Sequence, residues 1–308
     1  MKLYISESSK AEKNIVVDDM ILTTDMPTSA GSKMLDGYMS LFESEVVTRL
    51  KSHDYTVFAK SNTGEMGIDL LGETSYYGAC TDEKGNIVNA LAQSIKTKDS
   101  MAGIAFEVNG TATRAAAISG LTFVKPTYGT VSRFGTIASA CSGETVSVMA
   151  EDAATCKYIL EAIAGHDDKD GTSLPQEICD KAKEVASVKK IAVAKSLLAN
   201  ISDETKAAMN SVIEKAKANG IEVVEIEAKE LLLSKSAWNI LMSAEVCNNV
   251  SRYDGVKYGY RSPNYTTIDE LYTNSRTEAF GYLLKSTILY GSEALSTDNY
   301  MKVYDKSM

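Results

Sequence analysis

Short apolar runs alternate with amphipathic stretches along this chain, which is typical of a domain built from strands and helices in turn. The apolar runs predicted to be strands occupy Asn14–Leu22, Tyr55–Ala59, Met101–Ala105, Leu121–Val124 and, after a turn, Thr130–Phe134. The stretches predicted to contain helices occupy Glu43–Lys51, Asn109–Ser119, Glu151–Ala164, Trp238–Ser251 and Ser275–Thr297. The polar segment Met1–Lys13 is expected to be frayed.

A βαβ unit is predicted in the second half of the chain. Lys190–Ala194 and Ile221–Ile226 read as strands on either side of a helix from Ser202 to Ala218. Ser202 is a suitable N-cap, acidic residues follow it in the first turn, and Gly220 is a suitable stop. Such a unit implies parallel strands joined by a right-handed crossover.

Composition narrows the class of protein. The 308 residues are 44% hydrophobic, which is enough for one large domain or two modest ones. The net charge of −9, without a basic cluster, disfavours a direct grip on nucleic acid. The sequence has no long apolar span or arginine-rich leader, so we expect a cytoplasmic protein that does not enter a membrane.

Cysteine and histidine usage disfavours several kinds of site. The five cysteines are scattered without a CxxC pair, which disfavours a zinc site or a disulfide framework. Two histidines, His53 and His166, are too few for a histidine-rich metal site, and they disfavour a histidine-based triad. We therefore expect neither a metal nor a cofactor.

Three motifs are more specific than composition. Lys125–Gly135 reads KPTYGTVSRFG, Glu151–Ala154 reads EDAA with LEAIAGHD after it, and Ser251–Arg261 reads SRYDGVKYGYR. Together they resemble the amidase signature family, in its branch of glutamyl-tRNA(Gln) or aspartyl-tRNA(Asn) amidotransferase A subunits. The resemblance covers nearly the whole chain. It implies an α/β fold with a mixed, mostly parallel sheet covered by helices on both sides, in a single domain spanning residues 1–308.

The resemblance also implies a site for amide hydrolysis, made of a nucleophilic serine, a second serine in a cis peptide and a lysine. Matching each motif in turn places Thr111 at the nucleophile, Gln93 at the second serine and Asp18 at the lysine. Ser94 replaces Gln93 if the gap moves by one residue. All three positions of the triad have therefore changed, and we predict that the triad is not functional.

Each change has its own physical consequence. At Asp18 a negative charge stands where a neutral amine is needed, and we favour a solvated acidic strand end or N-cap there. The segment Asn89–Ser94 contains no glycine to ease a cis turn, which costs roughly 3–4 kcal/mol outside proline. Thr111 keeps a hydroxyl, but its methyl group stiffens χ1 and crowds the path of attack, so we favour a helix N-cap.

The implied substrate-binding positions are Asn109, Gly110 and Ser286. Asn109 replaces the first of two glycines that let backbone N–H groups face an oxyanion. Ser286 and Thr287 stand where an arginine pair would hold a carboxylate, which neither can do as a bidentate partner. Cys141 is a tempting replacement nucleophile, but a buried structural thiol is the commoner case.

Three functional hypotheses remain open. Compared with full-length members of the family that it resembles, we expect the chain to be truncated before the strand at Asn14 and after Tyr304, so that part of the pocket wall is missing. The first hypothesis is a noncatalytic relative that pairs with itself or with amidotransferase subunits of the B and C types. The second is an active amidotransferase subunit or amide hydrolase that uses Thr111. In the third, a second polypeptide completes the fold.

Overall fold

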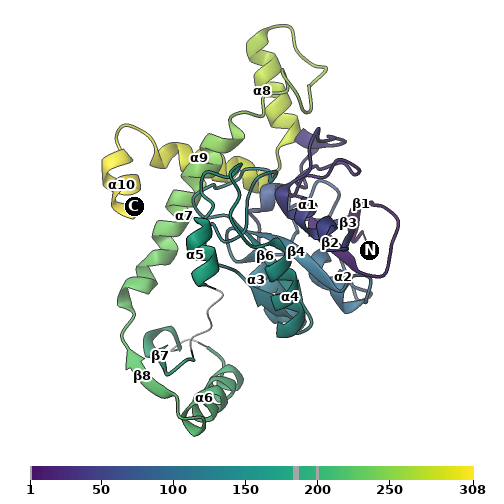
Figure 1. Cartoon of the computed structure of the whole chain (residues 1–308). Coiled ribbons are helices and arrows are strands. Elements are labelled where there is room, and N and C mark those ends of the chain that lie inside the picture. Colours follow the sequence, from purple (N-terminus) through teal and green to yellow (C-terminus); the bar gives the residue numbers. More distant parts are fainter. Residues whose placement is uncertain (1, 183–186, 199–200) are drawn as a thin grey trace.

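A six-stranded sheet forms the centre of the protein, as the computed structural model shows for residues 2–182, 187–198 and 201–308 (Figure 1). The strand order is β1-β3-β2-β4-β6-β5. The strands are β1 (Tyr4–Glu7), β2 (Asn14–Asp18), β3 (Thr56–Ser61), β4 (Ala102–Glu107), β5 (Thr122–Val124) and β6 (Thr145–Ala150).

The sheet is mixed, and most of its strands point in one direction. Strand β2 pairs in parallel with both β3 and β4, whereas β6 is antiparallel to both β4 and β5. Strands β2, β3, β4 and β5 therefore share a direction, and β1 and β6 oppose it. The predicted mixed, mostly parallel sheet is confirmed.

Helices cover both faces of this sheet. Along β2, Ile15 and Val17 face α1 (Glu45–Ser52) and α4 (Ala153–Ile163). Val16, on the other face, packs in the cluster that holds α2 (Ala90–Lys96) and α3 (Thr111–Ser119). This alternation follows from the two-residue period of a strand, because successive side chains point to opposite faces.

A third apolar cluster lies beyond the carboxyl ends of the parallel strands. It joins Met20, after β2, and Phe106, at the end of β4, to Met242 and Leu284. Met242 comes from α7 (Lys229–Val250) and Leu284 from α9 (Tyr282–Ala294), which run side by side (Figure 1). This cluster fixes two long helices against the edge of the sheet where a site is expected.

The predicted βαβ unit forms, and it stands away from the central sheet (Figure 1). Strand β7 (Lys190–Ala194) pairs in parallel with β8 (Glu222–Ile226) across α6 (Asp203–Ala218). The Ser202 hydroxyl accepts a hydrogen bond from Thr205 N, as expected of an N-cap. After β8 the chain enters α7, whose side chains from Glu230 to Ser236 are exposed before the helix reaches its packed half.

The remaining helical segments connect or flank these elements. They are α5 (Gln176–Lys181), α8 (Ile268–Ala279), α10 (Asp305–Ser307), three 3₁₀ turns at Lys33–Leu35, Glu65–Gly67 and Lys195–Leu198, and a π-helical turn at Tyr300–Tyr304. No helix in the described part of the chain is long and apolar enough to span a bilayer.

Two predicted strand and helix assignments are wrong. Thr130–Phe134 is a loop with one isolated bridge, from Val131 to Ala164, because Arg133 N donates to the Asp170 carboxylate instead of to a strand. Ser275–Thr297 is not one helix: α8 ends before Phe280, and Gly281 N turns aside to donate to Glu65 Oε2 at 2.8 Å.

Among the elements that the sequence analysis does not predict are β1, β6 and α2. The N-terminal segment is not frayed along its whole length, because β1 pairs with β3. The fully buried strand β6 was not predicted. The segment expected to be a loop at Asn89–Ser94 begins α2 instead, with Asn89 Oδ1 accepting from Ala92 N at 3.0 Å.

Candidate functional site

The carboxyl ends of β2, β3 and β4 meet at one edge of the sheet. Asp18, the last residue of β2, is in register with Ser61 at the end of β3. Its neighbour Val17 is in register with Ile104 of β4. Residues that follow β4, including Asn109 and Thr111, therefore emerge at the edge where β2 ends.

Thr111 is the first residue of α3, and its side chain is buried. Its hydroxyl donates a hydrogen bond to the carbonyl oxygen of Asp69. The N-cap of the helix is Gly110, at φ +84°, so the prediction that Thr111 is the N-cap is wrong. Glu107 caps this end of the helix instead, since its carboxylate accepts from Gly110 N at 2.6 Å and Thr113 N at 2.9 Å.

Asp18 is only partly exposed and belongs to a group of buried charges. Its carboxylate accepts long hydrogen bonds from Met20 N and Phe106 N, both at 3.4 Å. Burial raises the pKa of Asp18 to about 7, and the neighbouring Asp19 carboxylate adds to the rise. The expectation of a solvated strand end or N-cap is therefore wrong, because β2 lies between β3 and β4 and the Asp18 carboxylate accepts from Met20 N and Phe106 N.

Asp19 and Lys60 complete this group. Asp19 Oδ2 accepts from Ser29 N at 2.9 Å, whereas Asp19 Oδ1 has no hydrogen-bond partner among the described residues. Burial raises the pKa of Asp19. The ammonium group of Lys60, fully buried, donates to the Ile21 carbonyl and the Thr28 hydroxyl.

The sequence analysis gives no role to Lys60, which lies near the end of β3. Burial lowers the pKa of Lys60 to about 8, and the Asp19 and Asp18 carboxylates oppose that shift. Lysine is rarely fully buried, and nothing local in the sequence marks this one as an exception.

Gln93 lies within α2, on the sheet face opposite α1 and α4. The adjacent Ser94 is buried, and its hydroxyl is bonded to Tyr4 Oη at 2.8 Å and to Ser100 Oγ at 3.0 Å. Within the described residues, no hydrogen bond joins Gln93 or Ser94 to Thr111. The structure thus places two of the three residues predicted at triad positions, Thr111 and Asp18, at the same edge, while Gln93 lies in a helix that the family pattern does not predict.

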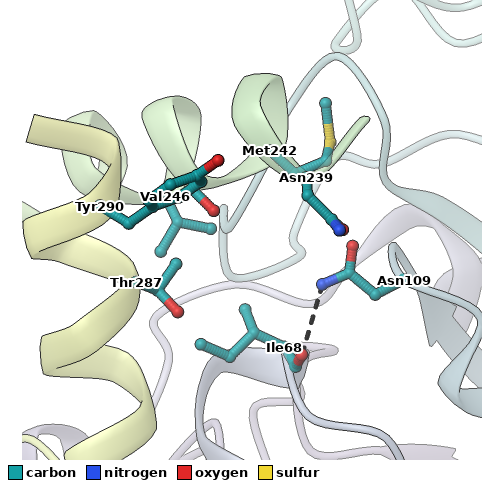
Figure 2. Close-up of a pocket in the computed structure, with 8 residues that line it drawn as sticks. Ile68, Asn109, Asn239, Met242, Val246, Thr287 and Tyr290 are labelled. Carbon is teal, nitrogen blue, oxygen red and sulfur yellow. Dashed lines mark hydrogen bonds between the residues drawn. The ribbon is translucent and has the colours of Figure 1, made fainter. Parts of the chain in front are cut away.

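A pocket of about 280 Å³ opens next to Asn109, between α7, α9 and the segment around Ile68 (Figure 2). The Asn109 amide is held at both ends, because Nδ2 donates to Ile68 O at 3.3 Å and Oδ1 accepts from Trp238 Nε1 at 3.1 Å. The lining residues are Ile68, Asn109, Asn239, Met242, Ser243, Val246, Thr287 and Tyr290.

Only part of the predicted binding set borders this pocket. Asn109 lines it, and Gly110 follows directly, with open space where a Cβ would stand. Ser286 is not among the lining residues; its neighbour Thr287 supplies the hydroxyl from α9. Asn239 and Ser243 of α7 were not predicted, because only the tertiary packing of α7 against α9 brings them to the pocket.

The KPTYGTVSRFG motif has a scaffolding role rather than a place in the pocket. Arg133 is bonded through Nη1 to the Glu144 carboxylate at 2.9 Å and to Cys141 O at 2.7 Å. Ser132 Oγ donates to Asp167 Oδ2 at 2.6 Å. The motif therefore ties the loop after β5 to the segments after α4 and before β6, and it can persist without catalysis.

Comparison with known proteins gives a consistent match. The model of the family described as Amidase matches residues 14–83 and 98–308. The glutamyl-tRNA(Gln) amidotransferase A subunit of Latilactobacillus sakei is 34% identical over 303 residues, which are 95% of this chain and 62% of the relative. The protein of the same name from Neisseria meningitidis serogroup A is 32% identical, over 95% of this chain and 63% of that protein.

Solved structures share the fold. The crystal structure of the glutamyl-tRNA(Gln) amidotransferase A subunit from Thermotoga maritima superposes with a TM-score of 0.75 at 21% identity, over 99% of this chain and 66% of that one. The K. lactis urea amidolyase gives 0.78 at 20% identity, over 99% of this chain and 19% of that one. The chain spans less than two thirds of the length of the curated relatives it matches. The segment from 84 to 97, which the family model skips, contains α2.

Proposed function

We propose that this chain, which belongs to the amidase signature family, is a noncatalytic member that acts by binding. The reason is that the three positions predicted for the catalytic triad hold Thr111, Gln93 and Asp18 in place of the family's two serines and lysine. The observation that carries this proposal is the hydrogen bond from the Thr111 hydroxyl to the Asp69 carbonyl oxygen. A nucleophilic hydroxyl must pass its proton to a base. A backbone carbonyl cannot take that proton, so this hydrogen bond serves structure rather than attack.

The other two positions support the same reading. Gln93 carries an amide, which is a poor proton relay, and it lies in the middle of α2. Asp18 brings a carboxylate where the family has a lysine. Because Asp19 lies next to it, a further negative charge at this edge would oppose the development of an oxyanion.

The binding partner that we propose is another protein, either a second copy of this chain or an amidotransferase subunit of the B or C type. Large apolar side chains are exposed on the two helices that border the pocket, including Leu231, Leu233, Tyr282 and Leu289, at 53%, 74%, 87% and 72% exposure. Apolar surface of this kind favours protein contacts. The relatives are themselves named as subunits. We place the complex in the cytoplasm and propose no direct contact with nucleic acid.

One observation favours a second candidate, an active amidase or amidotransferase subunit that uses Thr111. Asp18, with a pKa raised to about 7, could accept a proton near neutral pH. It lies at the same sheet edge as Thr111 and would become the general base once a substrate displaced the Asp69 contact.

Ammonia release separates the two candidates. Purified protein is incubated with glutamine, asparagine and small amides beside Thr111→Ala and Asp18→Asn variants. We expect no release above the variants. Release that vanishes in Thr111→Ala would establish the active candidate instead. Native mass spectrometry, of the chain alone and mixed with B and C subunits, tests the partner, and a monomer under every condition would contradict it.

A further inference from the structure

We propose that a separate pocket, between α8 and α9, binds a carboxylate carried on a short branched apolar group. The pocket has a volume of about 210 Å³. In the part of the chain that the structure describes, no acidic side chain lines it. The lining consists of two basic residues, three apolar ones and a threonine: Arg276, Lys285, Phe280, Ile288, Leu289 and Thr277.

This pocket lies on the opposite side of α9 from the pocket next to Asn109. Successive residues of an α-helix are rotated by about 100° around its axis. Lys285 and Leu289, four residues apart, therefore share one side of α9. Thr287, which lines the pocket next to Asn109, is rotated by about 200° from Lys285. The α8–α9 pocket is thus a different site from the one beside the sheet edge.

The Arg276 guanidinium is held by one of its nitrogens and keeps the other two for a ligand. Nη1 donates to Val250 O at 3.1 Å and to Tyr253 O at 2.9 Å. Among the described residues, no group accepts from Nε or Nη2. These two nitrogens form the side of a guanidinium that can donate to both oxygens of one carboxylate. The Phe280 ring, 5.0 Å from the guanidinium carbon, further restricts the side chain, so less entropy is lost on binding.

Neither cation of the pocket has a carboxylate partner in the described part of the chain. Lys285 Nζ donates to Thr277 O at 3.0 Å and keeps two N–H donors. Asp254 and Glu65, the carboxylates whose charges reach these cations, are each held by a backbone N–H instead. Burial lowers the pKa of Arg276, as expected of a cation without an ion pair. Two such cations in one pocket favour an anionic ligand from outside.

The apolar side chains and the size of the pocket define the rest of the ligand. Phe280 is buried, Ile288 is partly buried, and Leu289 is 72% exposed at the rim. A volume of about 210 Å³ corresponds to roughly seven water-sized volumes, at ~30 Å³ each. This size suits a small branched acid such as 3-methylbutanoate. The same chemistry occurs at the end of a polypeptide whose last residue is leucine.

The test measures binding of 3-methylbutanoate by ligand-observed NMR and isothermal titration at pH 7.5. The matched ketone 4-methylpentan-2-one has the same branched body, with a methyl group in place of the charged oxygen. We expect the acid to bind at least about 10-fold more tightly than the ketone, because hydrogen bonds to charged groups are the stronger ones. A tetrapeptide of sequence GSGL with a free carboxyl end distinguishes the two sources. Tighter binding than that of the acid indicates a chain terminus, and weaker binding indicates a free acid.

Two substitutions locate the site without removing the contacts of Arg276. Lys285→Gln removes one cation, so it is expected to weaken the acid several-fold and to leave the ketone unchanged. Leu289→Asp places a negative charge at the exposed rim and is expected to weaken the acid by about 10-fold or more, because like charges repel. The control Lys302→Gln, at an exposed lysine of the π-helical turn, is expected to leave both ligands unchanged.

Three results would overturn the inference: no binding of the acid or the peptide, equal binding of the acid and the ketone, or acid binding that survives both substitutions in variants whose thermal melts show that they are folded. None of these measurements depends on ammonia release. The noncatalytic proposal and the α8–α9 pocket are therefore tested separately, and either can fail without the other.

Discussion

Replacing Asp18 by asparagine should stabilise the protein at neutral pH and should do so less as the pH falls. The carboxylate lies at the end of a central strand, where burial and Asp19 raise its pKa from 3.8 to about 7. Asparagine has the same shape and no charge. The Thr63 hydroxyl, which interacts with the Asp18 carboxylate, can rotate to accept from the new NH₂ group, while the single amide oxygen keeps one of the two long backbone hydrogen bonds, from Met20 N or Phe106 N, and the other is lost.

The magnitude follows from linkage. A pKa that moves from 3.8 to about 7 disfavours the charged form in the folded protein by ~4 kcal/mol at a pH above both values. Asp18 keeps some contact with solvent, so we expect about 2 kcal/mol in practice. The folded state holds the proton to higher pH than the unfolded state, so wild-type stability falls as the pH rises from about 4 to about 7.

The assay is urea denaturation at intervals from pH 4 to pH 8. The variant and the wild type should be close near pH 4, and the gap should widen to about 2 kcal/mol by pH 7.5 and then stay constant. Asp298→Asn, at an exposed carboxylate, serves as the control and should follow the wild type. Parallel profiles for Asp18→Asn and wild type, or a loss of stability at pH 7.5, would refute the reasoning.

Three further substitutions test the scaffold by urea denaturation at pH 7. Thr111→Val removes the hydroxyl that donates to the Asp69 carbonyl oxygen and should lower the free energy of unfolding by about 1–3 kcal/mol. Thr111→Ser keeps the hydroxyl and should cost less. Equal costs for the two variants would show that this hydrogen bond does not stabilise the protein. Arg133→Met leaves the buried Glu144 carboxylate uncompensated and should cost about 3–5 kcal/mol, unlike the exposed Arg114→Met. Gly135→Ala places a Cβ 2.3 Å from Ser44 Cα at a φ of +82°, so it should destabilise the protein by more than ~1 kcal/mol. The control Gly37→Ala has a similar φ of +73° but open space around it, so it should cost only the backbone strain of about 1 kcal/mol.

The elements that the sequence predicted well carry their signals locally. The helix α6 has Ser202 before it and Gly220 after it, and its flanking strands are short β-branched runs. By contrast, β6 reads TVSVMA, and it is buried on both faces. The hydroxyl groups of Thr145 and Ser147 form a hydrogen bond with each other at 3.3 Å. These two residues can therefore lie in a buried strand, although their polarity in the sequence does not predict one.

For the site, the sequence predicted Thr111, Asp18 and Asn109, which remain predictions, but it did not predict what surrounds them. The helix α2 had a usable local signal, since Asn89 is a good cap and ALAQSIK favours a helix, but the family pattern outweighed it. Lys60 could not be recognised as buried, because its partners Ile21 and Thr28 reach it only through folding. The same holds for Asn239, which reaches the pocket only because α7 packs on α9.

The helix α7 joins two very different surroundings within one continuous run of backbone hydrogen bonds. From Glu230 to Ser236 its side chains are exposed, whereas Met242, Val246 and Val250 are sealed into the third apolar cluster. Amide protons in the first two turns are therefore protected only by the helix itself and should exchange with deuterated water rapidly. Those near Val250 should exchange only when the whole molecule unfolds. Exchange rates along this one helix would therefore range from rapid local fraying to slow global unfolding.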